Sequence, residues 1–279
     1  MINFNGVILD SNIQLSVNNR SFLYGDGVFE TLKIVDGKIL FFEDHYFRLM
    51  ASMRIIRMEI PMSFTLEFLE EQIVKLASIN KVEHSARVRF TVFRNEGGFY
   101  SPNDNSISYV IQTSALSSKN YQIEKSTFEV DLYKDYVVTK QLLSTLKTTN
   151  KMIQVTASIF AKENQLDSCL LVNESKNVIE AVSGNLFMLM GSQLITPAIS
   201  EGCLNGIMRK QIMSLVKQLE GVEIVEKEIS PFDLQKADEL FITNVIVGIQ
   251  PITKYRKKDF GTQFSSQLVE KLNMQINSK

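Results

Sequence analysis

The amino-acid sequence predicts an α+β protein with a small first domain and a larger, strand-rich second domain. Hairpin signals and helical periods alternate through the first third of the chain. A polar, serine-rich stretch, SALSSKNYQ, follows, and short apolar segments separated by turns dominate beyond it. Such a change of pattern is typical of a domain boundary. We therefore predict a first domain over residues 1–115, a linker over 116–122 and a second domain over 123–279.

Two hairpins and a helix are expected at the start of the first domain. The dipeptides NG at 5–6 and DG at 36–37 favour type I′ turns, whose two central residues both have positive φ. The second turn joins the strand-like segments VFETLKIV and KILFF. We expect the following helix to be capped by Asp44 and to end near Met58.

The remaining elements are predicted from their periods. The segment TLEFLEEQIVKLA repeats apolar residues at helical spacing, and ARVRFTVFR alternates in the manner of a half-buried strand. SISYVIQT continues the sheet after a turn at NEGG. In the second domain the expected strands are CLLVN, NVIEA, NLFMLM and QLITP, and a helix is expected to begin near Gly206. These strands predict a barrel or an open sheet with added helices.

Composition excludes several classes of function. With 30 basic and 31 acidic residues the 279-residue chain has a net charge of −1, which does not favour nucleic-acid binding. Two separated cysteines fit a reducing compartment, and two histidines make a histidine-rich metal site unlike this chain. No apolar run approaches the ~20 residues of a spanning helix. We expect a cytoplasmic protein that binds neither metal nor membrane.

Several single residues could carry chemistry, but each also has an ordinary explanation. Lys147 lies in LLSTLKTTNKMIQ, between a strand and a helix, and is either a solvated charge or a reactive amine. LNGIMR places a helix start at Gly206, which either binds phosphate or binds nothing. Arg48 either points to solvent or binds a phosphate or carboxylate. Glu180 ends a strand and could be solvated there.

The order of the motifs is more specific than any one of them. It resembles the class IV aminotransferase family, the fold-type IV pyridoxal-phosphate enzymes, over about residues 2–255. The resemblance implies a small α/β domain, a larger pseudo-barrel domain, pyridoxal 5'-phosphate as cofactor and a homodimer. The motifs that carry it are NRSFLYGDGVFET, DHYFRL, LKTTN, VIEAVSGNLF, LNGIMR and FITNVIVGIQPI.

The resemblance also implies roles for individual residues. Lys147 is expected to hold the cofactor as a Schiff base and to be the catalytic residue, Arg48 to bind the phosphate, and Glu180 to pair with the pyridine nitrogen. Met208 and Val245 depart from the family pattern, because many members have a threonine hydroxyl there, so backbone donors must bind the phosphate. The other implied cofactor contacts are Ser183, Gly184, Asn185, Leu204, Gly206, Ile207 and Asn244.

Three branches of the family are compatible with the sequence. LNGIMRKQ, FRNEGGFYSP and Asn150 resemble aminodeoxychorismate lyases, whereas Tyr24 and Glu30 resemble the branched-chain and D-amino acid aminotransferases. The resemblance implies substrate contacts at Tyr24, Glu30 and Arg94, although Arg94 could equally be a solvated strand end. We expect a lyase, with an aminotransferase as the alternative. A relative without catalysis is disfavoured, since the lysine, arginine and glutamate are all present.

Overall fold

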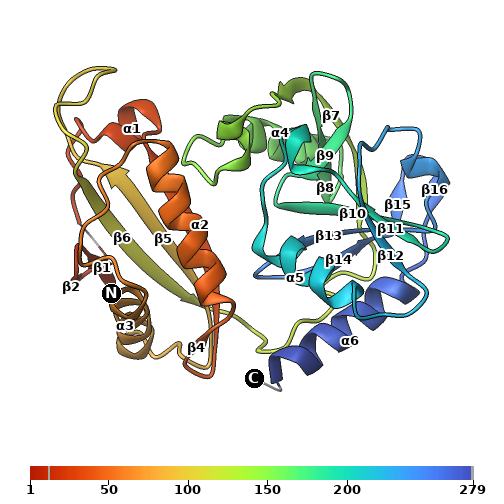
Figure 1. Ribbon diagram of the computed structural model, residues 1–279, viewed down its shortest axis with the longest axis horizontal. Helices are drawn as coiled ribbons and strands as arrows, with labels where there is room; N and C mark the ends of the chain where they lie inside the picture. Colours follow the sequence, from red (N-terminus) through yellow and green to blue (C-terminus); the bar gives the residue numbers. More distant parts are fainter. Residues whose placement is uncertain (12, 278–279) are drawn as a thin grey trace. The chain divides into compact units, whose positions relative to one another are not determined.

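The computed structural model describes residues 1–11 and 13–277, and the chain divides into two compact units (Figure 1). Unit 1 comprises Met1–Lys119 together with Lys147–Asn150, and unit 2 comprises Asn120–Leu146 together with Lys151–Lys279. The segment 147–150, which the sequence placed in the second domain, pairs instead with a strand of unit 1. The predicted α+β class is confirmed, since each unit combines a sheet with helices.

Unit 1 is built on an antiparallel sheet with the strand order β2-β1-β6-β5-β3-β4. Both predicted hairpins are confirmed: φ is 51° and 86° at residues 5–6, and 46° and 77° at residues 36–37. The strands are β1 Ile2–Phe4, β2 Val7–Leu9, β3 Gly27–Val35, β4 Lys38–Ile39, β5 Ser85–Arg94 and β6 Ile107–Ala115.

Two helices, α2 (Phe42–Ile55) and α3 (Leu66–Ile79), pack on one face of this sheet. The predicted cap of α2 is wrong, because the helix begins before Asp44 and Phe41 precedes it in a left-handed conformation. Asp44 lies instead in the first turn, where its charge favours the helix dipole. The predicted end near Met58 is also too late, since α2 ends at Ile55. Short helix α1 spans Arg20–Tyr24.

The two faces of the unit 1 sheet differ sharply. Val28, Leu32 and Ile34 of β3 face the helices and belong to the buried core. Successive side chains of a strand alternate between faces, so Phe29 lies on the opposite face. The segment 147–150 extends the sheet beside β3, with the Phe29 amide donating to the Lys147 carbonyl at 2.8 Å. The Thr149 amide donates in turn to the Gly27 carbonyl at 2.9 Å.

Unit 2 contains a branched ten-stranded sheet in which β10 pairs with three other strands. One edge of β10 pairs with β13, and its other edge pairs first with β9 and then with β11. The first five strands are β7 Glu129–Val138, β8 Ser168–Asn173, β9 Val178–Ala181, β10 Gly184–Met190 and β11 Gln193–Thr196. The others are β12 Glu223–Glu226, β13 Glu239–Asn244, β14 Gly248–Ile252, β15 Lys254–Tyr255 and β16 Lys258–Asp259.

Helices cover this sheet at three places. Helix α4 packs on β7 and β8, α5 packs on β12 and β13, and α6 packs on β13 and β14. The predicted helix near residue 206 is confirmed as α5. The helices are α4 Met152–Glu163, α5 Ile207–Val216 and α6 Gln263–Asn277, and the 3₁₀ turns are η1 Leu142–Thr145, η2 Ile199–Glu201 and η3 Leu234–Lys236.

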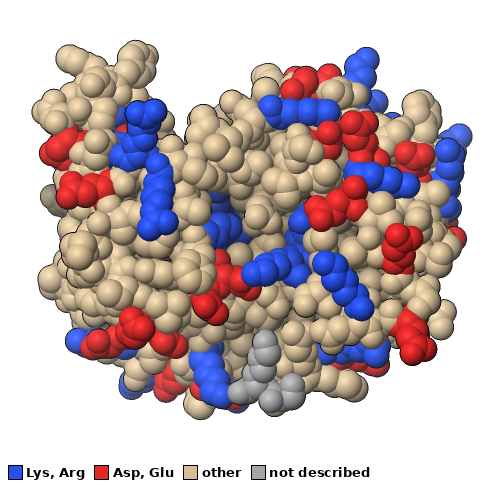
Figure 2. Space-filling model, in the orientation of Figure 1, with Lys and Arg blue, Asp and Glu red and all other residues tan. Residues whose placement is uncertain are grey.

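The surface carries both signs of charge, interspersed on the face shown in Figure 2. None of the helices in the described part of the chain is long and apolar enough to cross a membrane. Residues 1–11 and 13–277 also contain no group of three metal-ligating side chains placed to hold an ion.

Candidate active site

Lys147 lies beside β3 and directly opposite Phe29. The backbone pairing described above fixes its Cα, and its ammonium nitrogen lies 4.6 Å from the centroid of the Phe29 ring. The lysine therefore shares the sheet face of Phe29, away from the helices. An apolar ring beneath an amine limits its hydration, which suits a lysine that must lose its proton to act as a nucleophile.

Arg89 of β5 lies over the same ring, with its guanidinium carbon 3.8 Å from the ring centroid. Burial lowers the pKa of Arg89, and the neighbouring Arg87 lowers it further. Neither arginine side chain has an ion-pair or hydrogen-bond partner among the residues that the structure describes. A half-buried guanidinium without an acceptor is well suited to bind an anion. Lys147 and Arg89 thus lie within reach of one small ligand above Phe29.

Sequence reasoning missed Arg89, although a signal for it was present. The alternation of ARVRFTVFR assigns Val88 and Phe90 to the core, which leaves Arg87 and Arg89 on the opposite face. A pair of cations at alternate positions of a central strand is costly unless something anionic binds there. What local sequence could not provide was the pairing of β3 with residues 147–150.

Glu30 and Arg48 form a buried ion pair that includes His45. Arg48 donates from Nε and Nη2 to the two carboxylate oxygens at 2.7 and 2.5 Å, and His45 Nδ1 lies 2.7 Å from Oε2. Burial opposes ionisation of Glu30, but Arg48 and His45 outweigh it and lower its pKa to about 2. Glu30 was expected to contact the substrate, but this geometry assigns it to holding Arg48.

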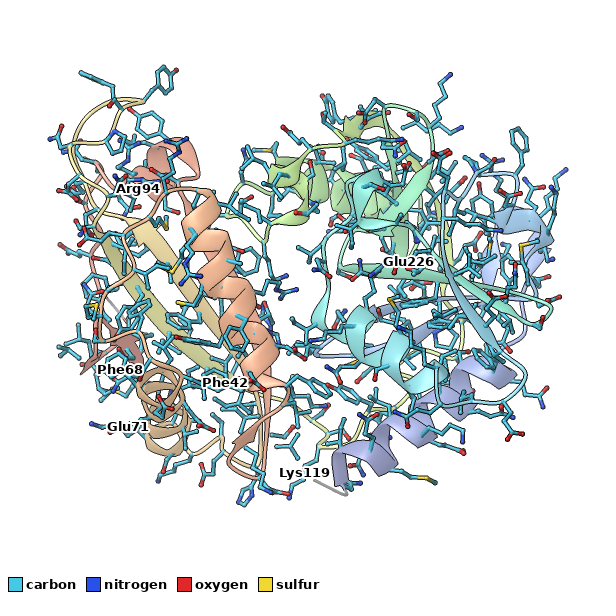
Figure 3. All side chains as sticks on the ribbon, in the orientation of Figure 1. Phe42, Phe68, Glu71, Arg94, Lys119 and Glu226 are labelled. Carbon is cyan, nitrogen blue, oxygen red and sulfur yellow. The ribbon has the colours of Figure 1, made fainter. Side chains whose placement is uncertain are left out.

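Arg94 ends β5 near α1, and its donors are occupied within unit 1 (Figure 3). Its Nε binds Asp26 at 3.0 Å, and its Nη2 binds the Ile56 carbonyl at 2.7 Å. The Nη1 donates to the Arg57 carbonyl at 3.1 Å and to the side chain of Asn105. The expected substrate contact at Arg94 is therefore replaced by a structural role, because these four bonds leave little of its fork for a ligand.

Tyr24, the other expected substrate contact, is 37% exposed at the end of α1. Its ring lies 5.7 Å from that of Tyr100, and the Arg20 guanidinium lies 5.0 Å from its centroid. The Tyr24 hydroxyl group is thus held in a cluster of aromatic and basic side chains at the edge of unit 1.

In unit 2, Glu180 ends β9 and is 8% exposed. Its carboxylate accepts a hydrogen bond from the Leu204 amide at 2.9 Å, and Asn185 donates to the Leu204 carbonyl at 2.7 Å. The loop before α5 is therefore fixed to β9 and β10. Lys151, which precedes α4, is close enough for charge coupling: burial lowers the pKa of Lys151, while Glu180 opposes that shift.

The start of α5 has the geometry of an anion site. Gly206 precedes the helix without a side-chain cap, and no described residue accepts from the amides of Ile207 and Met208. A side chain at Gly206 would place its Cβ 1.9 Å from Asn185 Oδ1, so only glycine fits. Free amides at the positive end of a helix dipole bind phosphate. A phosphorylated cofactor thus fits the residues present.

The second predicted phosphate loop is also tightly built. Asn244 donates to the Ser183 carbonyl at 3.1 Å and accepts from the amides of residues 246 and 247. Gly184 approaches β13 so closely that an added Cβ would lie 2.6 Å from the Thr243 carbonyl oxygen. Val245 is buried, and its carbonyl accepts from the Tyr121 hydroxyl at 2.7 Å. This loop therefore presents a fixed backbone.

Comparison with known proteins gives the family. The sequence model of class IV amino-transferases matches residues 27–255, most of the chain. The chain belongs to the class IV aminotransferase family. The protein is therefore one of a group of pyridoxal-phosphate enzymes that includes transaminases and lyases, as its motifs predicted. The roles of its individual residues stay predictions.

Its relatives are spread over the branches of the family. A protein of Methanocaldococcus jannaschii provisionally named branched-chain-amino-acid aminotransferase is 27% identical over 97% of this chain and 93% of its own length. A D-alanine aminotransferase of Listeria monocytogenes is 26% identical, covering 89% and 85%. An aminodeoxychorismate lyase of Bacillus subtilis is 25% identical, covering 94% and 89%.

Solved structures confirm the predicted fold type. A branched-chain aminotransferase from Thermoproteus uzoniensis matches with a TM-score of 0.87 at 21% identity, covering 99% of this chain and 93% of its own. A 4-amino-4-deoxychorismate lyase from Pseudomonas aeruginosa matches with a TM-score of 0.84 at 22% identity, covering 100% and 99%. One fold therefore hosts both reactions, and fold alone does not choose between them.

Proposed function

We propose that the protein is a pyridoxal-phosphate-dependent aminodeoxychorismate lyase, releasing pyruvate and 4-aminobenzoate for folate biosynthesis. The observation that carries the proposal is the pair of guanidinium groups of Arg87 and Arg89 without acceptors, beside Lys147. Aminodeoxychorismate has two carboxylates, one on its ring and one on its enolpyruvyl arm, and thus calls for two cations. The proposal includes a cytoplasmic homodimer, as the family resemblance implies.

The chain's own residues supply the groups that such a cofactor requires. We assign its covalent attachment to Lys147, its phosphate to Arg48 and the α5 amides, and its ring nitrogen to Glu180. Glu30 keeps Arg48 in place through two hydrogen bonds. When bound, pyridoxal phosphate supplies an electron sink for the pair of electrons left when the substrate loses a proton.

Lys147 is the residue that moves the proton in this proposal. Released by the incoming substrate amine, its neutral Nζ removes a proton from the ring carbon bearing that amine. The electron pair left behind expels the enolpyruvyl oxygen, so the C–O bond breaks and the ring becomes aromatic. Lys147 then returns the proton to the pyruvate enol. Arg89 holds a carboxylate throughout and stays protonated.

A class IV aminotransferase acting on branched-chain or D-amino acids with 2-oxoglutarate is the second candidate. It is favoured by the ring of Phe29 beside Lys147, since an apolar surface suits an aliphatic side chain. The arginine pair would then bind the two carboxylates of 2-oxoglutarate. In that reaction Lys147 returns the proton to the cofactor and not to pyruvate.

One pair of incubations separates the two functions. The protein purified with pyridoxal phosphate is mixed with aminodeoxychorismate, and separately with leucine or D-alanine plus 2-oxoglutarate. We expect 4-aminobenzoate and pyruvate in equal amounts from the first mixture and little glutamate from the others. Lys147→Ala serves as the control and should lose this activity and the borohydride-reducible visible absorbance. Rapid glutamate formation without 4-aminobenzoate would establish the aminotransferase instead.

A further inference from the structure

The outer surface of α4 is apolar although it faces solvent. Residues 152–161 of the helix contain no charged side chain. Ala157 and Ala161 are buried against β7 and β8. Met152, Val155 and Ile159, spaced at i, i+3 and i+7, are 67, 51 and 51% exposed. An exposed helix normally carries charge on its outer face, so this face lacks the partner that its composition demands.

Four neighbouring residues in the chain enlarge this apolar face. Tyr136 and Val137 at the end of β7 are 58 and 43% exposed, and Leu142 and Leu143 of η1 are 60 and 52% exposed. The pairing of β7 with β8 is interrupted between residues 133 and 138, which frees the strand end from the sheet. We call these seven residues the α4 surface: Tyr136, Val137, Leu142, Leu143, Met152, Val155 and Ile159.

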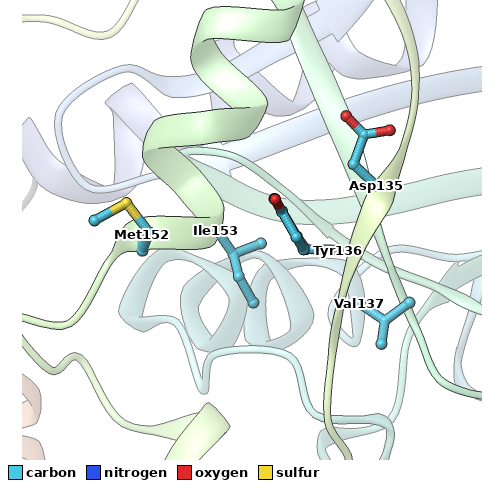
Figure 4. A pocket seen from close by; sticks show the side chains of 5 residues that line it. All are labelled: Asp135, Tyr136, Val137, Met152 and Ile153. Atoms are coloured by element: carbon cyan, nitrogen blue, oxygen red, sulfur yellow. The ribbon is translucent and has the colours of Figure 1, made fainter.

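The same surface is hollowed at the first turn of α4. A cavity of about 480 Å³ is lined by Asp135, Tyr136, Val137, Met152 and Ile153 (Figure 4). In Figure 4 the Tyr136 side chain projects toward the helix turn that carries Met152 and Ile153. Only Asp135 and the Tyr136 hydroxyl are polar, fewer than the convergent polar groups of an ordinary small-ligand site. The hollow is better suited to receive an apolar side chain.

We infer that the α4 surface is where two copies of this chain pair. Seven side chains, each about half exposed, present roughly 600 Å² of apolar area if each offers about 150–200 Å² in full. That approaches the ~800 Å² that each partner contributes to a stable interface and is at the upper limit of patches on monomers. The surface carries both protruding leucines and a hollow, as a self-complementary two-fold interface requires.

The inference deepens the proposed homodimer by naming its surface, and rests on it. Sedimentation velocity over a wide range of protein concentrations, with pyridoxal phosphate present, tests it. The variants are Val155→Lys and Ile159→Lys, with Val155→Thr as a milder change. Met274→Lys, on exposed α6 at 69% exposure, is the matched control. The lysine variants should raise the dimer dissociation constant about 100-fold or more, and Val155→Thr by about 10-fold.

Circular dichroism and thermal unfolding establish that each variant is folded. A wild-type protein that is monomeric at every concentration, or folded lysine variants that dimerise as tightly as the control, would overturn the inference. Cofactor absorbance and lyase turnover of the wild type, measured on the same samples, report separately on the proposed function. A dimer that depends on the α4 surface but produces no 4-aminobenzoate would leave the interface standing and remove only the lyase.

Discussion

Arg89 and Arg94 lie on the same strand but have opposite surroundings. Arg94 spends four hydrogen bonds on Asp26, Asn105 and two carbonyls at the end of α2, so it ties a loop and a helix to β5. Arg89 has only the face of Phe29 and the charge of Arg87 beside it. Two arginines that look alike in sequence are therefore separated by their acceptors, which are distant in sequence.

Their substitution should separate function from stability. Arg89→Gln should lower kcat/KM for the natural substrate about 10- to 100-fold, because a charged hydrogen bond contributes roughly 1.5–3 kcal/mol. Its urea midpoint should change little, since no internal contact is lost. Arg94→Gln, the matched control, should lower the free energy of unfolding by about 2–4 kcal/mol. Steady-state kinetics and urea unfolding of both variants check this; a kinetic loss confined to Arg94→Gln would restore Arg94 as the substrate residue.

At the level of elements, the start of α5 depends on one glycine and one asparagine. Asn185 binds the Leu204 carbonyl at 2.7 Å, and its side-chain oxygen occupies the space where residue 206 would carry a Cβ. Gly206→Ala should therefore displace Asn185 and rotate the free amides of α5, raising the cofactor dissociation constant about 10-fold or more. Absorbance titration with pyridoxal phosphate measures it. Gly261→Ala, whose nearest atoms are 3.9 Å away, is the control; equal affinities would show that the α5 start does not bind phosphate.

Local patterns predicted elements better than they predicted the contacts between them. The hairpins, α3, β5 and the start of α5 follow from turn residues and periods within about ten positions. The pairing of residues 147–150 with β3 joins segments some 120 positions apart, and no local period encodes it. The start of α2 was missed because Phe41 adopts a left-handed conformation that a bulky side chain rarely takes. The lysine was thus found by motif, and its neighbours only by structure.

Over the whole molecule, charge is nearly balanced, but unit 1 buries part of it. Glu30 is 2% exposed and ionised, and His45 is 1% exposed with a pKa lowered by burial. Neutral His45 donates through Nδ1 to Glu30, and its Nε2 has no hydrogen-bond partner among the described residues. Both groups bind protons more readily in the unfolded chain than in the folded one. The stability of the protein should therefore fall as the pH falls.

The window for Glu30 follows from its pKa of about 2 against a model value of 4.5. A lowered carboxylate pKa stabilises the fold above pH 4.5, and this contribution is lost as the pH falls toward 2. Between pH 5 and pH 3 the loss amounts to about 2 kcal/mol. Glu30→Gln removes that titration, so its free energy of unfolding should depend less steeply on pH by this amount, although it starts lower because Arg48 loses its partner. Urea unfolding at several pH values measures both slopes; parallel slopes for the wild type and Glu30→Gln would show that Glu30 is not the buried carboxylate that holds unit 1 together.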